Sequence, residues 1–214
     1  MLIKMSDLKK RFNINVTGIL HVGAHTCEEL SDYLQLGINI NNIYWIEALP
    51  ELVEKIKTQN NNIKIYQAVI SDIDNKEVVF NITKNDHTGD TQSSSLLEFG
   101  SHAISHPQVK MVAKRNMMTS RLETIIEKYN IDMKNINFIN LDIQGVELRA
   151  LKSMEKYLQN IDYIYTEVNT EEVYKGCDQM NDLTEYLKKF NFKLVTAKVY
   201  NQFGWGDAFY IKIK

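Results

Sequence analysis

Short hydrophobic runs alternate with amphipathic stretches along the first part of the chain. The runs at residues 19–24 and 43–48 are almost wholly apolar, which is typical of buried strands in a parallel sheet. After each run, apolar residues recur every three or four positions, and this spacing predicts helices over residues 27–37 and 50–60. The order strand, helix, strand, helix indicates an α/β fold.

The middle of the chain interrupts this pattern. Residues 63–70 predict a third strand, and residues 77–82 predict a fourth that pairs beside it or extends it. From residue 84 to residue 119 the chain is polar and irregular. A loop of this length inside a compact domain is usually a lid, a binding loop or disordered. Residues 84–119 are therefore predicted to be a loop insertion that covers the substrate.

The alternation returns in the C-terminal half. Ser120 and Glu123 have the spacing of a capping box, which predicts that a helix begins there. The last two predicted strands must be antiparallel, because the turn between them is too short for a crossover. The expected fold is an α/β, seven-stranded, mostly parallel sheet with a C-terminal antiparallel hairpin and helices on both faces. The other elements predicted here are strands over residues 136–143, 161–168, 192–200 and 207–213, and a helix over residues 182–190.

The composition disfavours several classes of partner. The chain has 25 basic and 27 acidic residues and a net charge of −2, so its charge favours neither nucleic acid nor a membrane surface. Cys27 and Cys177 show neither a disulfide framework nor metal-ligand spacing. No apolar run has the length of a signal-peptide core or a membrane span. We therefore expect a single cytoplasmic domain over residues 1–214, monomeric or homodimeric, in which residues 1–17 form an N-terminal helical extension.

Candidate binding residues lie where the predicted strands end. Gly23 follows the first strand in the sequence HVGAH, where a glycine lets backbone N–H groups approach a ligand closely. Glu47 ends the second strand, where a carboxylate can accept hydrogen bonds from both hydroxyls of a ribose. Alternatively, the glycine only permits a tight turn, and the glutamate is an exposed strand end without a partner. The pair fits any adenosine-containing cofactor, including NAD, and the antiparallel hairpin at the end of the sheet favours S-adenosylmethionine.

Five ordered segments of the chain carry a family resemblance. They are LHVGAHTCEEL, YWIEALPE, INLDIQGVELRALKSM, YTEVNTEEVY and GWGDAFYIK, and they extend over about residues 18–212. Together they resemble the FkbM-type methyltransferases, which are S-adenosylmethionine-dependent O-methyltransferases. The resemblance implies a Rossmann-like class I methyltransferase fold. It also implies that the cofactor contacts His21, Gly23, Ala24, His25, Glu47, Ala48, Ala68 and Val69.

The sequence departs from that family at three positions. His21 stands where many members have an acidic residue, and Cys27 stands where a glycine is usual. In the segment LDIQGVE, Gln144 replaces the glutamate that precedes the glycine of the family signature, so no role of that glutamate can be transferred. The residues that match the signature are Asp142, Gly145 and Glu147.

Asp142 is the leading candidate for a catalytic base. Transfer of a methyl group from a sulfonium to a hydroxyl requires the acceptor oxygen to lose its proton, and a carboxylate within hydrogen-bond reach can take it. Alternatively, Asp142 caps the helix that follows. Glu147 lies in the first turn of that helix, and we expect its role to be structural. Glu167, at the end of the next strand, is expected to join Asp142 around a substrate hydroxyl or a divalent cation such as Mg²⁺, although no Asp-Asp pair supports the metal.

The insertion supplies the candidates for substrate binding. Ser94 and Ser95 are expected to donate hydrogen bonds to the acceptor, and His102 is expected to contact it. His102 or His106 is an alternative base, although each histidine alone is more simply a solvated loop residue. A basic cluster is either a phosphate site for a nucleotide-linked substrate or, more simply, solvated surface charge. Its members are Lys110, Lys114, Arg115 and Arg121.

The predicted reaction is O-methylation of a sugar hydroxyl, with the sugar free, nucleotide-linked or part of a glycan. A first rival keeps the reaction but uses a polyketide or lipid hydroxyl, which the polar segment GDTQSSSL disfavours. A second rival is a catalytically silent cofactor-binding module, which predicts that Asp142 has no open space in front of it. A third is a dinucleotide-binding reductase, which predicts binding of NAD in preference to S-adenosylmethionine.

Overall fold

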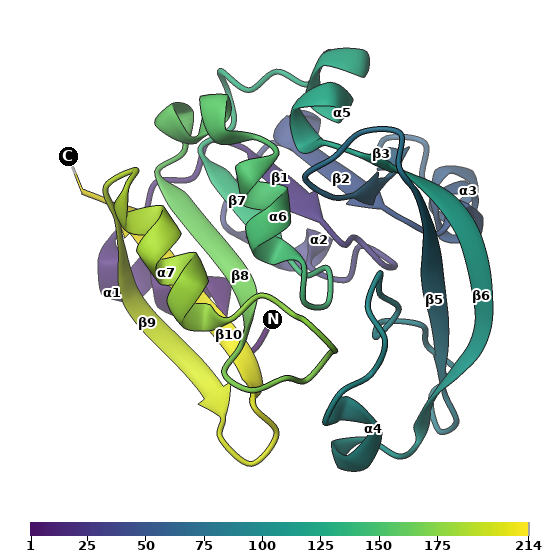
Figure 1. Cartoon of the computed structure of the whole chain (residues 1–214). Helices are drawn as coiled ribbons and strands as arrows, with labels where there is room; N and C mark the ends of the chain where they lie inside the picture. Colours follow the sequence, from purple (N-terminus) through teal and green to yellow (C-terminus); the bar gives the residue numbers. More distant parts are fainter. Residues whose placement is uncertain (214) are drawn as a thin grey trace.

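The computed structural model describes residues 1–213 and contains two sheets (Figure 1). The larger sheet has seven strands in the order β3-β2-β1-β7-β8-β10-β9. Its first five strands are parallel, whereas β10 runs antiparallel to both of its neighbours. The predicted fold class is therefore confirmed. The strands are β1 (Ile19–Val22), β2 (Ile43–Glu47), β3 (Lys64–Gln67), β7 (Phe138–Leu141), β8 (Tyr163–Asn169), β9 (Phe192–Tyr200) and β10 (Trp205–Lys212).

Helices cover both faces of the larger sheet (Figure 1). Because side chains alternate along a strand, consecutive residues of β1 enter different clusters, Ile19 with α1, α2 and α3, and Leu20 with α5, α6 and α7. Each cluster is a continuous apolar core between the sheet and its helices. The helices are α1 (Met5–Phe12), α2 (Leu30–Gln35), α3 (Pro50–Gln59), α5 (Leu122–Lys128), α6 (Glu147–Lys152) and α7 (Met180–Lys188), with 3₁₀ turns η1 (Ile40–Asn42) and η2 (Glu155–Asn160).

The smaller sheet corrects two predictions. Strand β5 (Glu77–Asn85) does not pair with β3; it pairs with β6 (Val109–Ser120), which also joins β4 (Val69–Ile70). Residues 109–119 of the predicted loop are therefore strand. Most of β6 is exposed or half-buried, so the apolar pattern that marks a strand is weak there. Residues 86–108 are irregular apart from the short helix α4 (His102–Ser105).

The predicted capping box is also absent. Helix α5 has Arg121 at its N-cap position without a side-chain capping bond. Instead, the Arg121 N–H donates to Asp74 Oδ1 at 2.7 Å, and the Leu122 N–H donates to Ser153 Oγ at 2.9 Å. Residues distant in sequence therefore accept hydrogen bonds from the N–H groups of the first turn, which have no partner within the helix.

No helix within residues 1–213 is both long enough and apolar enough to cross a membrane.

Candidate active site

The site lies where the strand order of the larger sheet reverses. From β1 the chain moves outward through β2 and β3, and it later returns to pair β7 with the other side of β1. The residues that follow these two strands, Gly23 and Asp142, therefore lie side by side, and the Asp142 N–H donates to Val22 O at 2.9 Å. A Cβ on Gly23 would lie 1.8 Å from Asp142 O, and the φ angle of Gly23 is +92°. Only glycine fits here, and ligands of such sheets bind at this switch point.

A cavity of about 360 Å³ opens at the switch point. Small and apolar side chains line one part of it, whereas carboxylates and the polar residues of the 86–108 segment line the rest. The residues expected at the site that do line the cavity are Gly23, Ala24, His25, Glu47, Ala48, Ala68, Val69, Ser94, His102, Asp142 and Glu167.

Two expected site residues, His21 and Ser95, are not on the cavity wall. The His21 ring stacks on Trp45, with ring centroids 4.6 Å apart, and its Nδ1 lies 3.0 Å from Tyr33 Oη. Burial lowers the pKa of His21 to about 3, so the ring is a neutral part of the core. Ser95 is also buried, and its Oγ donates to Gln144 O at 2.7 Å. Both side chains therefore contact other residues behind the cavity wall and do not face the cavity.

Glu47 is a buried carboxylate with two backbone partners. Its Oε2 accepts from the His25 N–H at 2.8 Å, and its Oε1 accepts from the Leu49 N–H at 2.9 Å. Burial raises the pKa of Glu47 above its ordinary value. The interpretation of Glu47 as an exposed residue without a partner is therefore wrong. Each of its oxygens keeps a second lone pair for a ligand.

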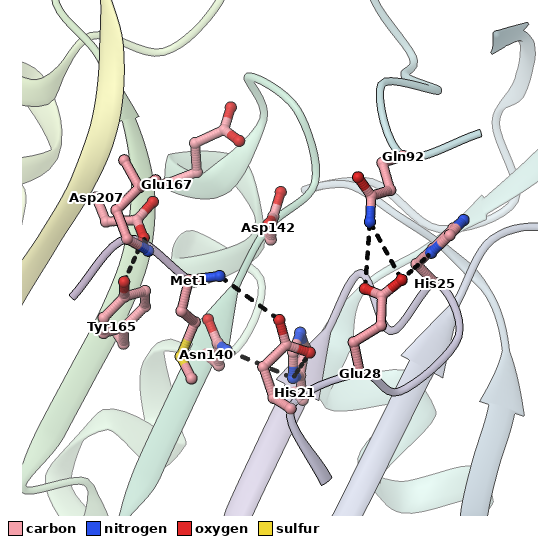
Figure 2. Close-up of polar contacts among 12 residues, drawn as sticks. Met1, His21, His25, Glu28, Gln92, Asn140, Asp142, Tyr165, Glu167 and Asp207 are labelled. Atoms are coloured by element: carbon pink, nitrogen blue, oxygen red, sulfur yellow. Dashed lines mark hydrogen bonds and ion pairs between the residues drawn. The ribbon is translucent and has the colours of Figure 1, made fainter. Parts of the chain in front are cut away.

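The loop after β1 carries a polar cluster that forms only in the folded chain. His25 Nδ1 lies 3.1 Å from Glu28 Oε1, and Gln92 Nε2 lies 3.2 Å from each oxygen of Glu28 (Figure 2). The hydrogen bond from His25 lowers the pKa of Glu28 to about 2. Gln92 thereby joins the 86–108 segment to this loop. One departure from the family lies in this loop: Cys27 has a φ angle of +58°, a conformation that favours the glycine usual at this position.

Asp142, Glu167 and Asp207 form an acidic wall on the other side of the cavity (Figure 2). Burial is the main cause that raises the pKa of Glu167 well above its ordinary value, and the nearby charge of Asp142 adds to it. Burial also raises the pKa of Asp207, which accepts from Tyr165 Oη and the Leu2 N–H. Asp207 lies in the quoted segment GWGDAFYIK, but only the fold shows that it reaches the cavity.

Asp142 does not cap the helix that follows it. Helix α6 begins at Glu147, and its Leu148 and Arg149 N–H groups donate to Asp178 Oδ2 at 2.9 and 3.2 Å. The capping alternative for Asp142 is therefore wrong. Within residues 1–213, no group of three His, Cys, Asp or Glu side chains is arranged to hold a metal ion.

The basic cluster does not reach the site. Lys110 pairs with Asp86 at 2.6 Å, Lys114 pairs with Glu98 at 3.0 Å, and neither lysine lines the cavity. Arg115 and Arg121 pair with Glu51 and Glu123. No lysine or arginine within the described residues lines the cavity. These positions favour the interpretation as surface charge.

A group of rings lies at the cavity wall near α4. The His102 ring stacks on Phe99, with centroids 4.4 Å apart, and the His106 centroid lies 4.8 Å from that of His102. Burial lowers the pKa of His102 to about 4, so its ring is neutral near pH 7. Tyr174 and Trp205 also line the cavity and were not expected at the site.

Comparison with known proteins agrees with this geometry. Residues 21–194 match the family model described as the methyltransferase FkbM domain. The structure resembles methyltransferase FkbM from Methylobacillus flagellatus KT, with a TM-score of 0.55 and 14% identity over 91% of this chain and 43% of that chain. It also resembles a ribosomal protein L11 methylase from Lactobacillus delbrueckii subsp. bulgaricus, with a TM-score of 0.51 and 8% identity over 98% of this chain and 77% of that one. A search of curated protein sequences finds no match.

At such low identities the two structures show the fold alone, and the chain spans less than half of the first of them. The family match is the stronger finding, because it extends over most of the chain and includes the loop after β1, Glu47, Asp142 and Glu167. The chain therefore belongs to the FkbM methyltransferase domain family, and its cofactor is S-adenosylmethionine.

Proposed function

We propose that this protein is an O-methyltransferase that transfers a methyl group to a hydroxyl of an uncharged sugar, with Asp142 as the base. The observation that carries the proposal is the position of Asp142, which lines an open cavity at the switch point beside the cofactor region. A catalytically silent module predicts that Asp142 is blocked, so the open cavity disfavours that alternative.

The cavity offers suitable contacts for each part of the cofactor. Ala68, Val69 and Phe80 form an apolar wall for the adenine ring, and Glu47 lies at the end of β2, where it can accept from ribose hydroxyls. The acidic wall favours a cationic group such as a sulfonium. When bound, S-adenosylmethionine supplies an electrophilic methyl group on that sulfonium.

Asp142 and Glu167 have different roles in this proposal. Burial, and to a smaller extent the charge of Asp142, raise the pKa of Glu167, so Glu167 holds a proton more tightly than an ordinary carboxyl group does. Asp142 is then the carboxylate that accepts the proton of the attacking hydroxyl.

The rest of the cavity suits a polar, uncharged acceptor. Thr91, Ser93, Ser94 and Gln108 line it with hydroxyl and amide groups, which can bond to sugar hydroxyls. A phosphate would be expected to contact lysine or arginine, and neither lines the cavity. We therefore favour a free sugar or a glycan over a nucleotide-linked sugar, and the polar lining disfavours a lipid or polyketide chain.

Calorimetry and an activity assay test the proposal. Purified protein is titrated with S-adenosylhomocysteine and with NAD, and methyl transfer is then assayed on neutral sugars, glycans and nucleotide sugars. We expect binding of S-adenosylhomocysteine only, and turnover that Asp142→Asn abolishes without weakening that binding. Asp86→Asn, at an exposed ion pair, is the matched control. Full turnover by Asp142→Asn, or a preference for NAD, would contradict the proposal.

A further inference from the structure

The side chain of Gln144 lies between the carboxyl groups of Asp142, the proposed base, and its neighbour Glu167. Its Nε2 is 2.6 Å from Asp142 Oδ1 and 2.7 Å from Glu167 Oε2. A primary amide has two N–H donors, and here each of them serves a different carboxyl group. No N–H of this side chain remains for a solvent or substrate contact.

The opposite end of the amide is also fixed. Tyr174 Oη donates to Gln144 Oε1, and Tyr174 is fully buried. The orientation of the amide is set by this network, because the reverse orientation would direct Oε1 at two acidic groups. The Gln144 backbone has a φ angle of +58°, and its carbonyl accepts from Ser95 Oγ. Both the side chain and the backbone of Gln144 are therefore held in one arrangement.

The amide nitrogen occupies the position that a bridging cation takes between two carboxylates. Two neighbouring acidic groups either share a proton or bind a positive group between them. At this site a neutral donor lies within 2.7 Å of both groups. It satisfies one oxygen of each, without the net charge and the coordination geometry that a metal ion would impose.

We propose that Gln144 is a positioning residue that fixes the carboxyl groups of Asp142 and Glu167 relative to each other for base catalysis. In this role its amide takes the place of a divalent cation between them. The inference rests on the proposed function, since it assigns Asp142 the role of base. It predicts that the wild-type protein neither binds nor needs Mg²⁺. It also predicts that a glutamate at position 144 creates a cation site from three carboxylates.

The test compares thermal unfolding in Mg²⁺ and in EDTA for wild type, Gln144→Glu, Gln144→Met and the control Gln59→Glu. Gln59 lies exposed on α3, so the same change there adds a charge without a carboxyl neighbour in the site. We expect the Tm of Gln144→Glu in EDTA to fall by roughly 5 °C or more and to recover in Mg²⁺, since the substitution adds a partly buried charge. Gln144→Met should lose Tm without recovery, and the other two proteins should not respond to Mg²⁺.

Two further measurements keep the outcomes distinct. Calorimetric titration of wild type with Mg²⁺ alone should give no heat of binding, and this test needs no variant to fold. Titration of each folded protein with S-adenosylhomocysteine reports separately on the proposed cofactor function. Binding of Mg²⁺ by wild type, or a Gln144→Glu protein that folds and ignores Mg²⁺, would overturn the inference even if S-adenosylhomocysteine binds. Loss of S-adenosylhomocysteine binding by wild type would overturn the proposed function instead.

Discussion

Replacement of Glu147 by glutamine should stabilise the protein increasingly as the pH rises. Glu147 is 1% exposed, and its Oε1 accepts from the Ile143 and Gly145 N–H groups at 3.0 and 3.1 Å. Burial is the main cause that raises its pKa from 4.5 to about 8. The amide oxygen of the substituted side chain could still accept both hydrogen bonds, whereas the amide has no proton to lose in this range.

The sign and the size of the effect of Glu147 on the free energy of unfolding follow from proton linkage. Between about pH 4.5 and pH 8 the folded protein keeps a proton on Glu147 that the unfolded chain releases, so the free energy of unfolding falls as the pH rises. Each pH unit costs about 1.4 kcal/mol. The cost of Glu147 is therefore about 3 kcal/mol at pH 7, and it vanishes below its ordinary pKa of 4.5.

Urea unfolding of wild type and Glu147→Gln at a series of pH values measures this cost. Groups that do not interact with Glu147 titrate equally in both proteins, so the difference reports on Glu147 together with its charge interaction with Glu167. Glu54→Gln is the matched control, since Glu54 is exposed on α3. A stability difference that stays constant from pH 5 to pH 8 would refute the reasoning, whatever its sign.

Three further substitutions test other parts of the structure. Gly23→Ala should abolish binding of S-adenosylhomocysteine and lower the Tm, because the new Cβ would overlap Asp142 O, and calorimetry and thermal unfolding measure both effects. Asp178→Ala should destabilise the protein by about 1–2 kcal/mol in urea unfolding, because the Leu148 and Arg149 N–H groups lose their acceptor. Arg115→Met should leave Tm and turnover on a neutral sugar unchanged, because its partner Glu51 is exposed; a loss of turnover would show that Arg115 contacts the acceptor.

The central strands β1, β2 and β7 could be predicted because their residues are buried on both faces. Such strands are continuous apolar runs, and their order along the chain is enough to place Gly23 and Asp142 at one edge. Strand β6 was missed because most of its length is exposed or half-buried and carries polar residues. Its pairing with β5 is a tertiary fact that a local pattern does not contain.

The sequence also could not show which distant residues accept hydrogen bonds from the helix ends or make hydrogen bonds within the site. Asp74, Ser153 and Asp178 are distant in sequence from the N–H groups that they accept, so no local spacing marks them. Gln92 reaches Glu28 across 64 positions for the same reason. For His21 the structure differs from the prediction. Its motif suggested a contact with a ligand, but the alternation of side chains along β1 directs the His21 ring into the core beside Trp45.

Three neighbouring polar residues in the segment after β7, Asp142, Gln144 and Glu147, have different roles. Gln144 and Gly145 have φ angles of +58° and +101°, so the chain reverses sharply and consecutive side chains point in different directions. Asp142 lines the cavity, Gln144 bridges it to Glu167, and Glu147 turns back to hold the N–H groups of the reversal. A Cβ on Gly145 would lie 2.8 Å from Cys177 Cβ, so only glycine permits this turn. The spacing of the signature is thus fixed by one turn that positions the proposed base Asp142, the bridging Gln144 and the buried Glu147 together.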